Sequence, residues 1–214
     1  MGSNTDPIVL SFHESLLRES DIQLLQGPHW LNDQIISFYF EYLEKFKYKN
    51  NSDILFISPE VTQCIKIVPD SDLHIFLSPL EAERKSFIFF PLNDNDSHMA
   101  GGSHWSLLVF SRPEKIFLHF DSSGNSNYSH CQIFVKKLKD ALNCKNALCK
   151  PMKCLQQTNA YDCGIHVLAM ADHIASHINR FECVNGIESL NHDAIVRKRK
   201  DILKIISSLG GKVY

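Results

Sequence analysis

Four side chains have the types and the order that nucleophilic catalysis at a carbonyl requires: His104, Asp121, Gln157 and Cys163. A cysteine nucleophile needs a base that holds or takes its proton, a group that orients this base, and hydrogen-bond donors for the oxyanion formed on attack. The histidine, the aspartate and the glutamine suit these three tasks in turn. The set predicts acyl transfer through Cys163.

Cys163 stands near the end of a polar, turn-rich stretch, 156–164. An apolar pattern with helical spacing follows at once and predicts a helix to about Phe181. A helix N-terminus lowers the pKa of a thiol placed there, and we expect the sulfur at this junction to be partly exposed. The competing interpretation is a buried structural thiol, the commoner role of a free cysteine.

His104 and Asp121 flank two strand-like runs, 104–110 and 116–120, joined by a short connector that contains Pro113. The length and composition of this connector suit a β-hairpin. The start of one strand and the end of the next are then neighbours, so His104 and Asp121 should face each other at one sheet edge. The carboxylate could there hold the imidazole tautomer and stabilise the imidazolium. A single His or Asp at a strand end is usually a surface residue, so this prediction depends on the pairing.

Gln157 lies on the loop that leads to Cys163. Its side chain can present an N–H group beside the backbone N–H of Cys163, and the two donors would form an oxyanion hole. Removing one such donor typically lowers turnover by about 100- to 1000-fold.

Two further stretches are candidates for substrate binding. Trp30 leads into a helix that Asn32 or Asp33 can cap, and its ring is either a hydrophobic staple or a lid over a groove. The spacing alone favours the staple. The polar loop 93–103 is too long for a tight hairpin and is either a binding loop or a solvated tip.

The remaining segments are expected to form the scaffold that positions these residues. Further strands or extended segments are expected at 8–12, 87–92 and 148–155. Helices are expected at about 14–18, 21–25, 33–46, 59–68, 70–77, 128–142 and 193–209. The basic run Arg197-Lys198-Arg199-Lys200 in the last helix is most simply a solvated face, and Gly210 fits the C-terminal cap.

Length and composition are those of an ordinary globular chain of 214 residues, 44% hydrophobic and 21% charged. We expect one domain over 1–214, with flexible ends at 1–7 and 210–214. The net charge of −2 argues against nucleic-acid or anionic-membrane partners. The sequence has no long apolar run or secretory signal, and an odd count of seven cysteines favours reduced thiols. These features predict a soluble protein of the cytoplasm, the nucleus or both.

Motifs at Trp30–Asp33, His104–Ser106, Phe120–Ser122, Gln157 and Asp162–Gly164 together resemble those of one enzyme family. This is the Ulp or sentrin-specific protease family, cysteine proteases that act on ubiquitin-like modifiers. The resemblance extends over about 8–209 and is strongest to the deneddylase branch, because of the compact length and of shared segments such as Ser-Pro-Glu-Val-Thr-Gln and Leu-Asn-Asp-Asn.

This resemblance implies an α+β fold of the papain-like clan, with a central mixed or antiparallel sheet flanked by helices and a permuted His-Asp-Cys order. By this resemblance, His104, Asp121 and Cys163 correspond to the family's catalytic triad, and Gln157 corresponds to its oxyanion-hole glutamine. It implies no cofactor and no metal. The reaction expected is hydrolysis of the bond that follows the terminal glycine of the modifier.

The resemblance also implies a binding site for the modifier. Trp30 and Trp105 would cover a narrow tunnel that admits only a side-chain-free Gly-Gly tail, which reverses the preference for a staple at Trp30. The body of the modifier would contact Asp33 and the loop 93–102, including Asn93, Asp94 and Asn95. Asp94 and Asp96 are the residues expected to meet a basic patch there.

The partner expected from this resemblance is the modifier Nedd with its conjugates, such as cullins. The enzyme is expected to process modifier precursors and to remove the modifier from substrate lysines. It is expected to be a monomer. SUMO or ubiquitin remains the alternative within the family. Alternatives outside it are an acetyltransferase with a His-acid-Cys set, a zinc-binding module on Cys144, Cys149 and Cys154, and an inactive modifier-binding domain. The last is disfavoured because all four catalytic positions are filled.

Overall fold

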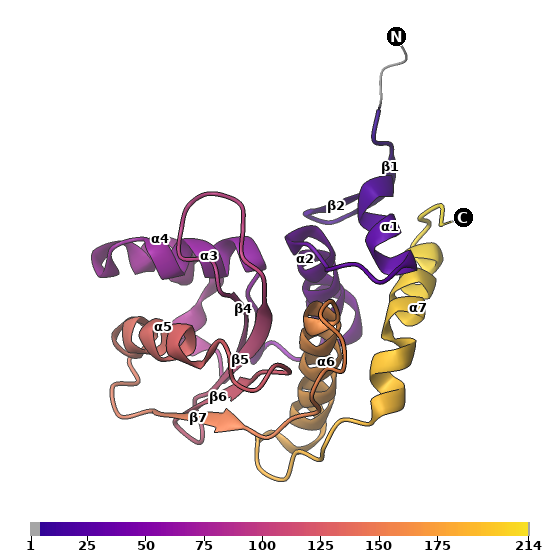
Figure 1. Ribbon diagram of the computed structural model, residues 1–214. Coiled ribbons are helices and arrows are strands. Elements are labelled where there is room, and N and C mark those ends of the chain that lie inside the picture. Colours follow the sequence, from indigo (N-terminus) through magenta and orange to yellow (C-terminus); the bar gives the residue numbers. More distant parts are fainter. Residues whose placement is uncertain (1–4, 214) are drawn as a thin grey trace.

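A computed structural model describes residues 5–213. Its centre is a five-stranded mixed sheet in the order β3-β4-β5-β6-β7 (Figure 1). The strands are β3 (Ile54–Phe56), β4 (Phe87–Asn93), β5 (Trp105–Ser111), β6 (Ile116–Phe120) and β7 (Leu148–Met152). The outer pairs, β3 with β4 and β6 with β7, are parallel, and the two inner pairs are antiparallel. The predicted α+β fold with a mixed sheet flanked by helices is confirmed.

Helices cover both faces of the sheet (Figure 1). α6 (Cys163–Phe181) crosses β5 on one face, with α2 (Asp33–Tyr42) packed beside it. The other face is covered by α3 (Pro59–Ile67), α4 (Leu73–Leu77) and α5 (Tyr128–Ala141). Because side chains alternate along a strand, Phe89, Leu107 and Val109 enter the α6 core, and Phe90, Leu108 and Phe110 enter the α5 core.

Two more helices, α1 (Glu19–Gln26) and α7 (His192–Ser208), lie against each other, and α7 also packs on α6 (Figure 1). α7 therefore lies on the side of α6 that faces away from the sheet. The predicted helices at 21–25, 59–68, 128–142 and 193–209 are confirmed within two residues at each end, and the helix from Cys163 to Phe181 is confirmed at both ends. None of the helices in residues 5–213 combines the length and the apolar character that crossing a membrane needs.

The first strand, β1 (Ile8–Phe12), is confirmed, but the helix predicted at 14–18 is wrong. Ser15–Arg18 forms β2, which pairs antiparallel with β1. His13 occupies the turn with a left-handed φ of 47°, and the carboxylate of Glu41 accepts the backbone N–H groups of Glu14 and Ser15. A four-residue run is too short for its periodicity to distinguish a strand from a helix, so the pairing partner decides.

Local caps explain where several helices begin. The Asn32 side chain accepts the backbone N–H of Ile35 at the start of α2, and the Ser58 hydroxyl accepts that of Val61 at the start of α3.

α2 ends earlier than predicted, at Tyr42, because the chain continues as a π-helix over Leu43–Lys47. The helix predicted at 70–77 divides into a 3-10 turn (Asp70–Asp72) and α4. Further 3-10 turns are formed by Ser78–Leu80 and Ala82–Arg84.

The expected flexible ends, 1–7 and 210–214, lie partly outside the described residues, which exclude 1–4 and 214. Within the described part, the Asp6 carboxylate accepts two hydrogen bonds from Ser20. Gly210 has a φ of +95° and ends α7, which confirms the predicted cap. Gly211 is buried, and its N–H donates to the Ile206 carbonyl, so flexibility was the wrong expectation for this residue.

The basic run of α7 is not a solvated face throughout. Arg197 and Lys200 are exposed, whereas Lys198 is buried, with its ammonium 3.0 Å from the Tyr39 hydroxyl and 3.3 Å from the Asp172 carboxylate. Arg199 is half-buried and points toward α1. The prediction was wrong for these two residues because α7 turns this side toward α1, α2 and α6.

Candidate active site

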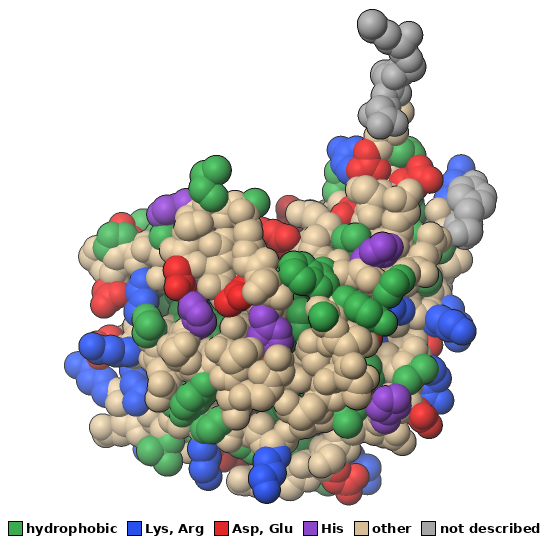
Figure 2. Space-filling model, viewed as in Figure 1, with side chains coloured by type: hydrophobic (Ala, Val, Ile, Leu, Met, Phe, Trp, Pro, Cys, Tyr) green, Lys and Arg blue, Asp and Glu red, His purple; other side chains and the backbone are tan. Residues whose placement is uncertain are grey.

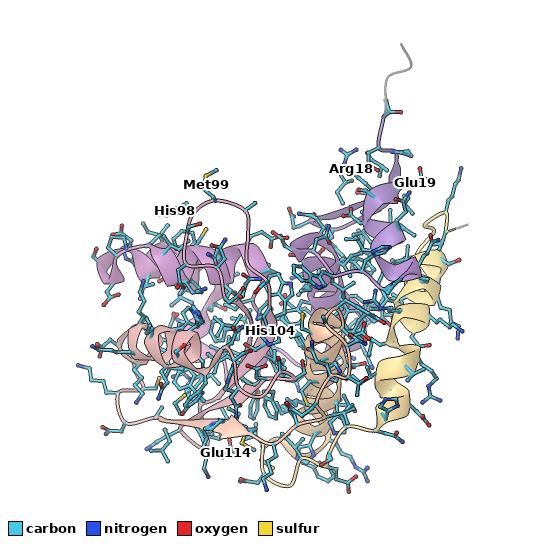
Figure 3. The ribbon with its side chains drawn as sticks, viewed as in Figure 1. Arg18, Glu19, His98, Met99, His104 and Glu114 are labelled. Carbon is cyan, nitrogen blue, oxygen red and sulfur yellow. The ribbon has the colours of Figure 1, made fainter. Side chains whose placement is uncertain are left out.

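His104 and Asp121 meet at one edge of the sheet, as the hairpin predicts. β5 and β6 pair with Leu107 opposite Phe120, which brings the residue before β5 beside the residue after β6. The imidazole Nε2 of His104 lies 2.7 Å from Oδ1 of Asp121. His104 lies in the space between the sheet and α6 (Figure 3). The predicted contact between the two side chains is confirmed.

Asp121 is only 1% exposed, and both oxygens of its carboxylate accept hydrogen bonds. Besides His104, its oxygens accept the backbone N–H groups of Ser123 at 2.9 Å and Asn127 at 2.8 Å. Burial raises the pKa of this carboxyl, but the hydrogen bond with His104 and the two amides outweigh burial and hold the pKa below its ordinary value. Asp121 therefore stays ionised and is fixed in place.

His104 is half-buried and touches both of its expected partners. Burial alone lowers the pKa of its imidazole, but the hydrogen bonds with Asp121 and Cys163, together with their charges, raise it to about 9. Since Nε2 is bonded to Asp121, Nδ1 is the nitrogen that remains for the thiol. The arrangement places the imidazolium of His104 beside the thiol of Cys163, as a nucleophile and its base require.

Cys163 is the first residue of α6, as predicted, but its predicted partial exposure is wrong because it is only 2% exposed. The segment before α2 lies over the first turn of α6. A Cβ added at Gly164 would lie 3.0 Å from the Leu31 side chain, closer than an ordinary contact, so a glycine suits this close approach. The Asn159 side-chain oxygen accepts the N–H groups of Tyr161 and Asp162 and shapes the turn before Cys163.

Gln157 is anchored to the loop that follows Asp121. Its backbone N–H donates to the Ser122 carbonyl at 2.9 Å, and its side-chain oxygen accepts the Ser122 hydroxyl at 2.8 Å. Its amide nitrogen donates to the Asn159 carbonyl at 2.7 Å. A primary amide carries two N–H groups, so this arrangement leaves one of them for an oxyanion.

The two tryptophans are each fixed by the indole N–H. Trp30 is 51% exposed, and its Nε1 donates to the Ala160 carbonyl in the loop before Cys163, at 2.6 Å. This exposure contradicts a staple. Trp105 is half-buried at the start of β5, and its Nε1 donates to the Leu31 carbonyl at 3.2 Å. Both rings thus connect the segment before α2 to the elements that carry Cys163 and His104.

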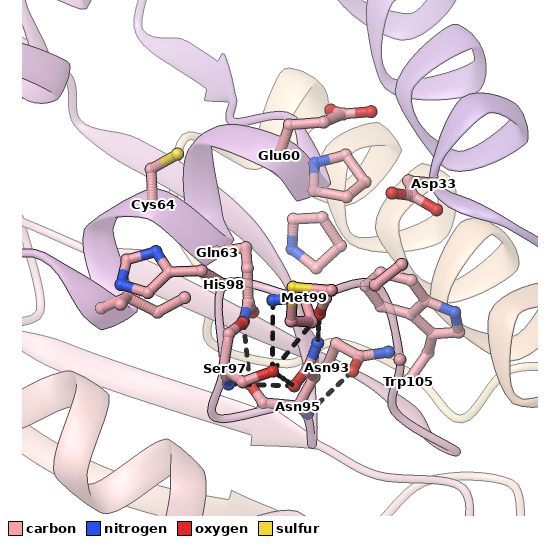
Figure 4. Close-up of a pocket in the computed structure, with 15 residues that line it drawn as sticks. Asp33, Glu60, Gln63, Cys64, Asn93, Asn95, Ser97, His98, Met99 and Trp105 are labelled. Atoms are coloured by element: carbon pink, nitrogen blue, oxygen red, sulfur yellow. Dashed lines mark hydrogen bonds between the residues drawn. The ribbon is translucent and has the colours of Figure 1, made fainter.

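A pocket of about 360 Å³ lies beside Trp105, between α3, the first turn of α2 and the loop 93–103 (Figure 4). Asp33 and Trp105 line one side. Asn93 and Asn95 shape the loop, since the Asn93 side chain accepts the Asn95 N–H and the Asn95 amide donates to the Met99 carbonyl. The pocket is therefore a preformed surface beside the candidate site.

The two acidic residues of this loop have different surroundings. The Asp94 carboxylate accepts the N–H and hydroxyl of Ser103 and the N–H of His104, and these bonds hold its pKa below the ordinary value despite burial. Asp94 thus braces the loop against His104. Asp96 is the outward carboxylate, with its side chain 71% exposed and 3.1 Å from His130. On this face of the molecule, Lys and Arg lie mainly toward the margins (Figure 2).

The sequence did not single out Asn127 as a part of the site. It is buried, and besides its N–H bond to Asp121, its side-chain amide donates to the Leu92 carbonyl, the His104 carbonyl and the Ser106 hydroxyl. Asn127 therefore ties both members of the His-Asp pair to the sheet. Its only signal in the sequence is a polar loop before a helix, which does not distinguish it from the neighbouring Ser and Asn residues.

The three cysteines of the zinc alternative point to different partners. The Cys149 sulfur lies 3.9 Å from that of Cys131, and the Cys154 thiol donates to the Asp121 carbonyl. Cys144 is half-buried near Arg112. Across residues 5–213, no three His, Cys, Asp or Glu side chains cluster in a way that could hold a metal ion.

Comparison with known proteins links this site to one family. The Ulp1 protease family, C-terminal catalytic domain, matches residues 29–208. The chain is 38% identical to sentrin-specific protease 8 of Homo sapiens over 211 residues, 97% of this chain and 100% of that protein. It is 31% identical to NEDD8-specific protease 1 of Arabidopsis thaliana over 221 residues, 98% of this chain and 97% of that protein.

The fold also has a solved counterpart. The Ulp1 protease domain in complex with Smt3, the yeast ortholog of SUMO, superposes with a TM-score of 0.75 over 98% of this chain and 91% of that chain. The sequences are 19% identical, so this likeness shows the fold alone.

Proposed function

This chain belongs to the Ulp1 protease family of cysteine proteases, and we propose that it cleaves after the C-terminal Gly-Gly of a NEDD8-type modifier. The observation that carries the proposal is the His104 imidazole held at 2.7 Å by the buried Asp121 carboxylate, with Cys163 as its other partner at the N-terminus of α6. The relatives named NEDD8-specific protease support the choice of modifier.

The proposed reaction begins with attack by the Cys163 sulfur on the carbonyl of the modifier's last glycine. The oxyanion is held by the free N–H of the Gln157 amide and the backbone N–H of Cys163. The imidazolium of His104 gives its proton to the leaving amine, and the C–N bond breaks to leave a thioester. Neutral His104 then takes a proton from water, which attacks the thioester and frees the modifier's carboxylate. Asp121 remains ionised and keeps the ring oriented.

Trp30 and Trp105 are proposed to enclose the Gly-Gly tail as it reaches Cys163. Support comes from the anchoring of both indoles, through Ala160 and Leu31, to the segments that meet at the nucleophile. Only residues without a side chain pass between two closely spaced rings, so this arrangement would select the tail.

The globular body of the modifier is proposed to lie on the surface formed by α3, the loop 93–103 and Asp33. The pocket there supports this location. The outward carboxylates of Asp33 and Asp96 would meet basic groups of the modifier, while Asn93, Asp94 and Asn95 would hold the shape of the loop.

We further propose that the chain acts as one domain and as a monomer, in the cytoplasm, the nucleus or both. Its substrates would be modifier precursors and conjugates such as cullins. All seven cysteines carry free thiols, which is consistent with a reducing compartment.

A panel of three modifiers tests the proposed choice. NEDD8, SUMO and ubiquitin, each with a C-terminal electrophile in place of the scissile bond, are incubated with the wild-type chain, and the mass of the adduct is measured. The proposal predicts rapid labelling by the NEDD8 probe. Labelling by the SUMO or ubiquitin probe alone would contradict it.

A further inference from the structure

One side chain of α7 contacts three separate segments around the candidate active site. The Arg199 guanidinium places Nε and Nη2 at 3.1 Å and 2.7 Å from Oδ1 of Asp162. Its Nη1 donates to the Leu24 carbonyl at 2.6 Å, and Nη2 also donates to the His29 carbonyl at 2.7 Å. Arginine presents its donors in a rigid planar fork, so these bonds fix the three segments relative to one another.

The first of these segments is the turn that starts α6. Asp162 directly precedes Cys163, and its other carboxylate oxygen accepts the Asn159 amide at 2.8 Å. The side chains of Arg199 and Asp162 are only 15% and 18% exposed, so solvent screens the pair weakly. Without Arg199, this poorly solvated carboxylate would lose two of its three hydrogen-bond donors, in the residue that directly precedes Cys163.

The second segment carries the exposed tryptophan. His29 directly precedes Trp30, whose indole donates to the Ala160 carbonyl. Arg199 is therefore bonded to the chain on each side of the hydrogen bond between Trp30 and Ala160. It contacts the backbone just before Trp30 and, through Asp162, the loop that contains Ala160. The two segments are 130 residues apart in sequence at the Trp30–Ala160 bond.

We propose that Arg199 is a positioning residue, which sets the place of Cys163 relative to His104 and the place of Trp30 over the nucleophile loop. It does so from α7, without touching the reacting atoms. The part that concerns Trp30 rests on the proposed function. The part that concerns Cys163 does not, because it can be measured on the thiol alone.

The variant Arg199→Met tests the effect on the thiol. Alkylation of Cys163 by iodoacetamide is followed by peptide mass spectrometry, with the exposed Cys64 as an internal reference for the reagent. Because small displacements in an active site can cost about 100-fold in rate, we expect the ratio of Cys163 to Cys64 labelling to fall by at least fivefold. An unchanged ratio would overturn the proposal.

Neighbours in the same helix provide matched controls. Arg197→Met and Lys200→Met remove equally charged but exposed side chains, and both should label as the wild type does. A similar loss in these two variants would mean that the net charge of α7 matters and would overturn a specific role for Arg199. Arg199→Lys keeps the charge and should also fold. Lysine lacks the planar fork whose separate nitrogens reach Leu24, His29 and Asp162, so wild-type labelling in this variant would equally count against the proposal.

Kinetics separate positioning from loss of stability. At a temperature where circular dichroism shows each variant to be folded, we expect kcat of Arg199→Met on the modifier substrate to fall about 10- to 100-fold. Asp162→Asn should add little further loss in the Arg199→Met background, because both changes break the same contact. Fully additive losses would contradict the proposal. A wild-type chain that cleaves no modifier would refute the proposed function and leave the alkylation result intact.

Discussion

Asp121 holds His104 from the interior of the protein: the carboxylate is buried, while the imidazole that it contacts at 2.7 Å is half-buried. Backbone amides of Ser123 and Asn127 hold the carboxylate itself. The orientation of the base is therefore built on the sheet edge and the loop that follows β6. This placement also explains why the pKa of His104 lies well above that of a free imidazole.

Asp121→Asn should shift the pH dependence of cleavage. Because the pKa of His104 is raised to about 9, the wild-type imidazole is protonated below that pH, and kcat/KM should fall as the pH rises through about 9. Removing the carboxylate leaves only Cys163 to oppose the effect of burial on the pKa of His104, so the alkaline limb should move to lower pH. By analogy with other triads, kcat should also fall by roughly 100-fold or more.

The measurement is a pH–rate profile from about pH 5 to 10, with Asp140→Asn, a change at an exposed carboxylate of α5, as the control. A profile of Asp121→Asn with its alkaline limb unchanged would show that Asp121 does not set the protonation of His104.

Gln157→Ala should lower kcat by about 100- to 1000-fold with little change in KM, because an oxyanion donor acts in the transition state rather than in the bound substrate. Gln157→Glu is the matched variant. It keeps an oxygen for the Ser122 hydroxyl but has no N–H to donate. Steady-state kinetics of Gln157→Glu at the wild-type level would exclude the amide as a donor.

Trp30→Ala should relax the selection of the tail. The wild type should cleave a substrate ending in Gly-Ala at least about 100-fold less efficiently than one ending in Gly-Gly, since an added methyl meets the enclosing rings. In Trp30→Ala, the kcat/KM for the Gly-Gly substrate divided by that for the Gly-Ala substrate should be smaller than in the wild type. Phe46→Ala, which removes a similarly exposed ring away from the site, is the control, and an equal ratio in all three proteins would contradict the tunnel.

Lys198→Met should destabilise the fold without changing the active site directly. The variant leaves the half-buried Asp172 carboxylate with Lys47, Tyr39 and Tyr48, so we expect a loss of about 1–3 kcal/mol in the free energy of unfolding, less than for a fully unpaired charge. Urea denaturation measures this loss. The exposed Lys200→Met should stay within about 0.5 kcal/mol of the wild type, and an equal loss in both would mean that burial of Lys198 is unimportant.

The sequence predicted the parts of the site that depend on local geometry. A short connector was enough to bring His104 to Asp121, and a polar stretch followed by an apolar helical pattern located Cys163 at the first residue of α6. It could not predict that Cys163 would be buried, since the segment that contains Leu31 is far away in the chain and packs against the next residue, Gly164.

Long-range packing accounts for the other errors. Lys198 and Arg199 belong to a basic run, which is normally solvated. Their acceptors lie on α1, α2 and α6 and on the residues directly before Trp30 and Cys163, all distant in sequence. In β2, four residues carry too little periodicity to identify a strand, and only β1 and Glu41 decide the outcome. The position of the Trp30 indole is likewise anchored by Ala160, which lies 130 residues away in the sequence.

Turnover by Cys163→Ala tests the central claim most directly. NEDD8 with a C-terminal extension is incubated with this variant, and cleavage is followed by mass spectrometry while binding is measured by calorimetry. The account predicts that cleavage disappears and that the modifier still binds, whereas Cys183→Ala, at a part-exposed cysteine outside the proposed binding surface, cleaves as the wild type does. Cleavage retained by Cys163→Ala would contradict the account.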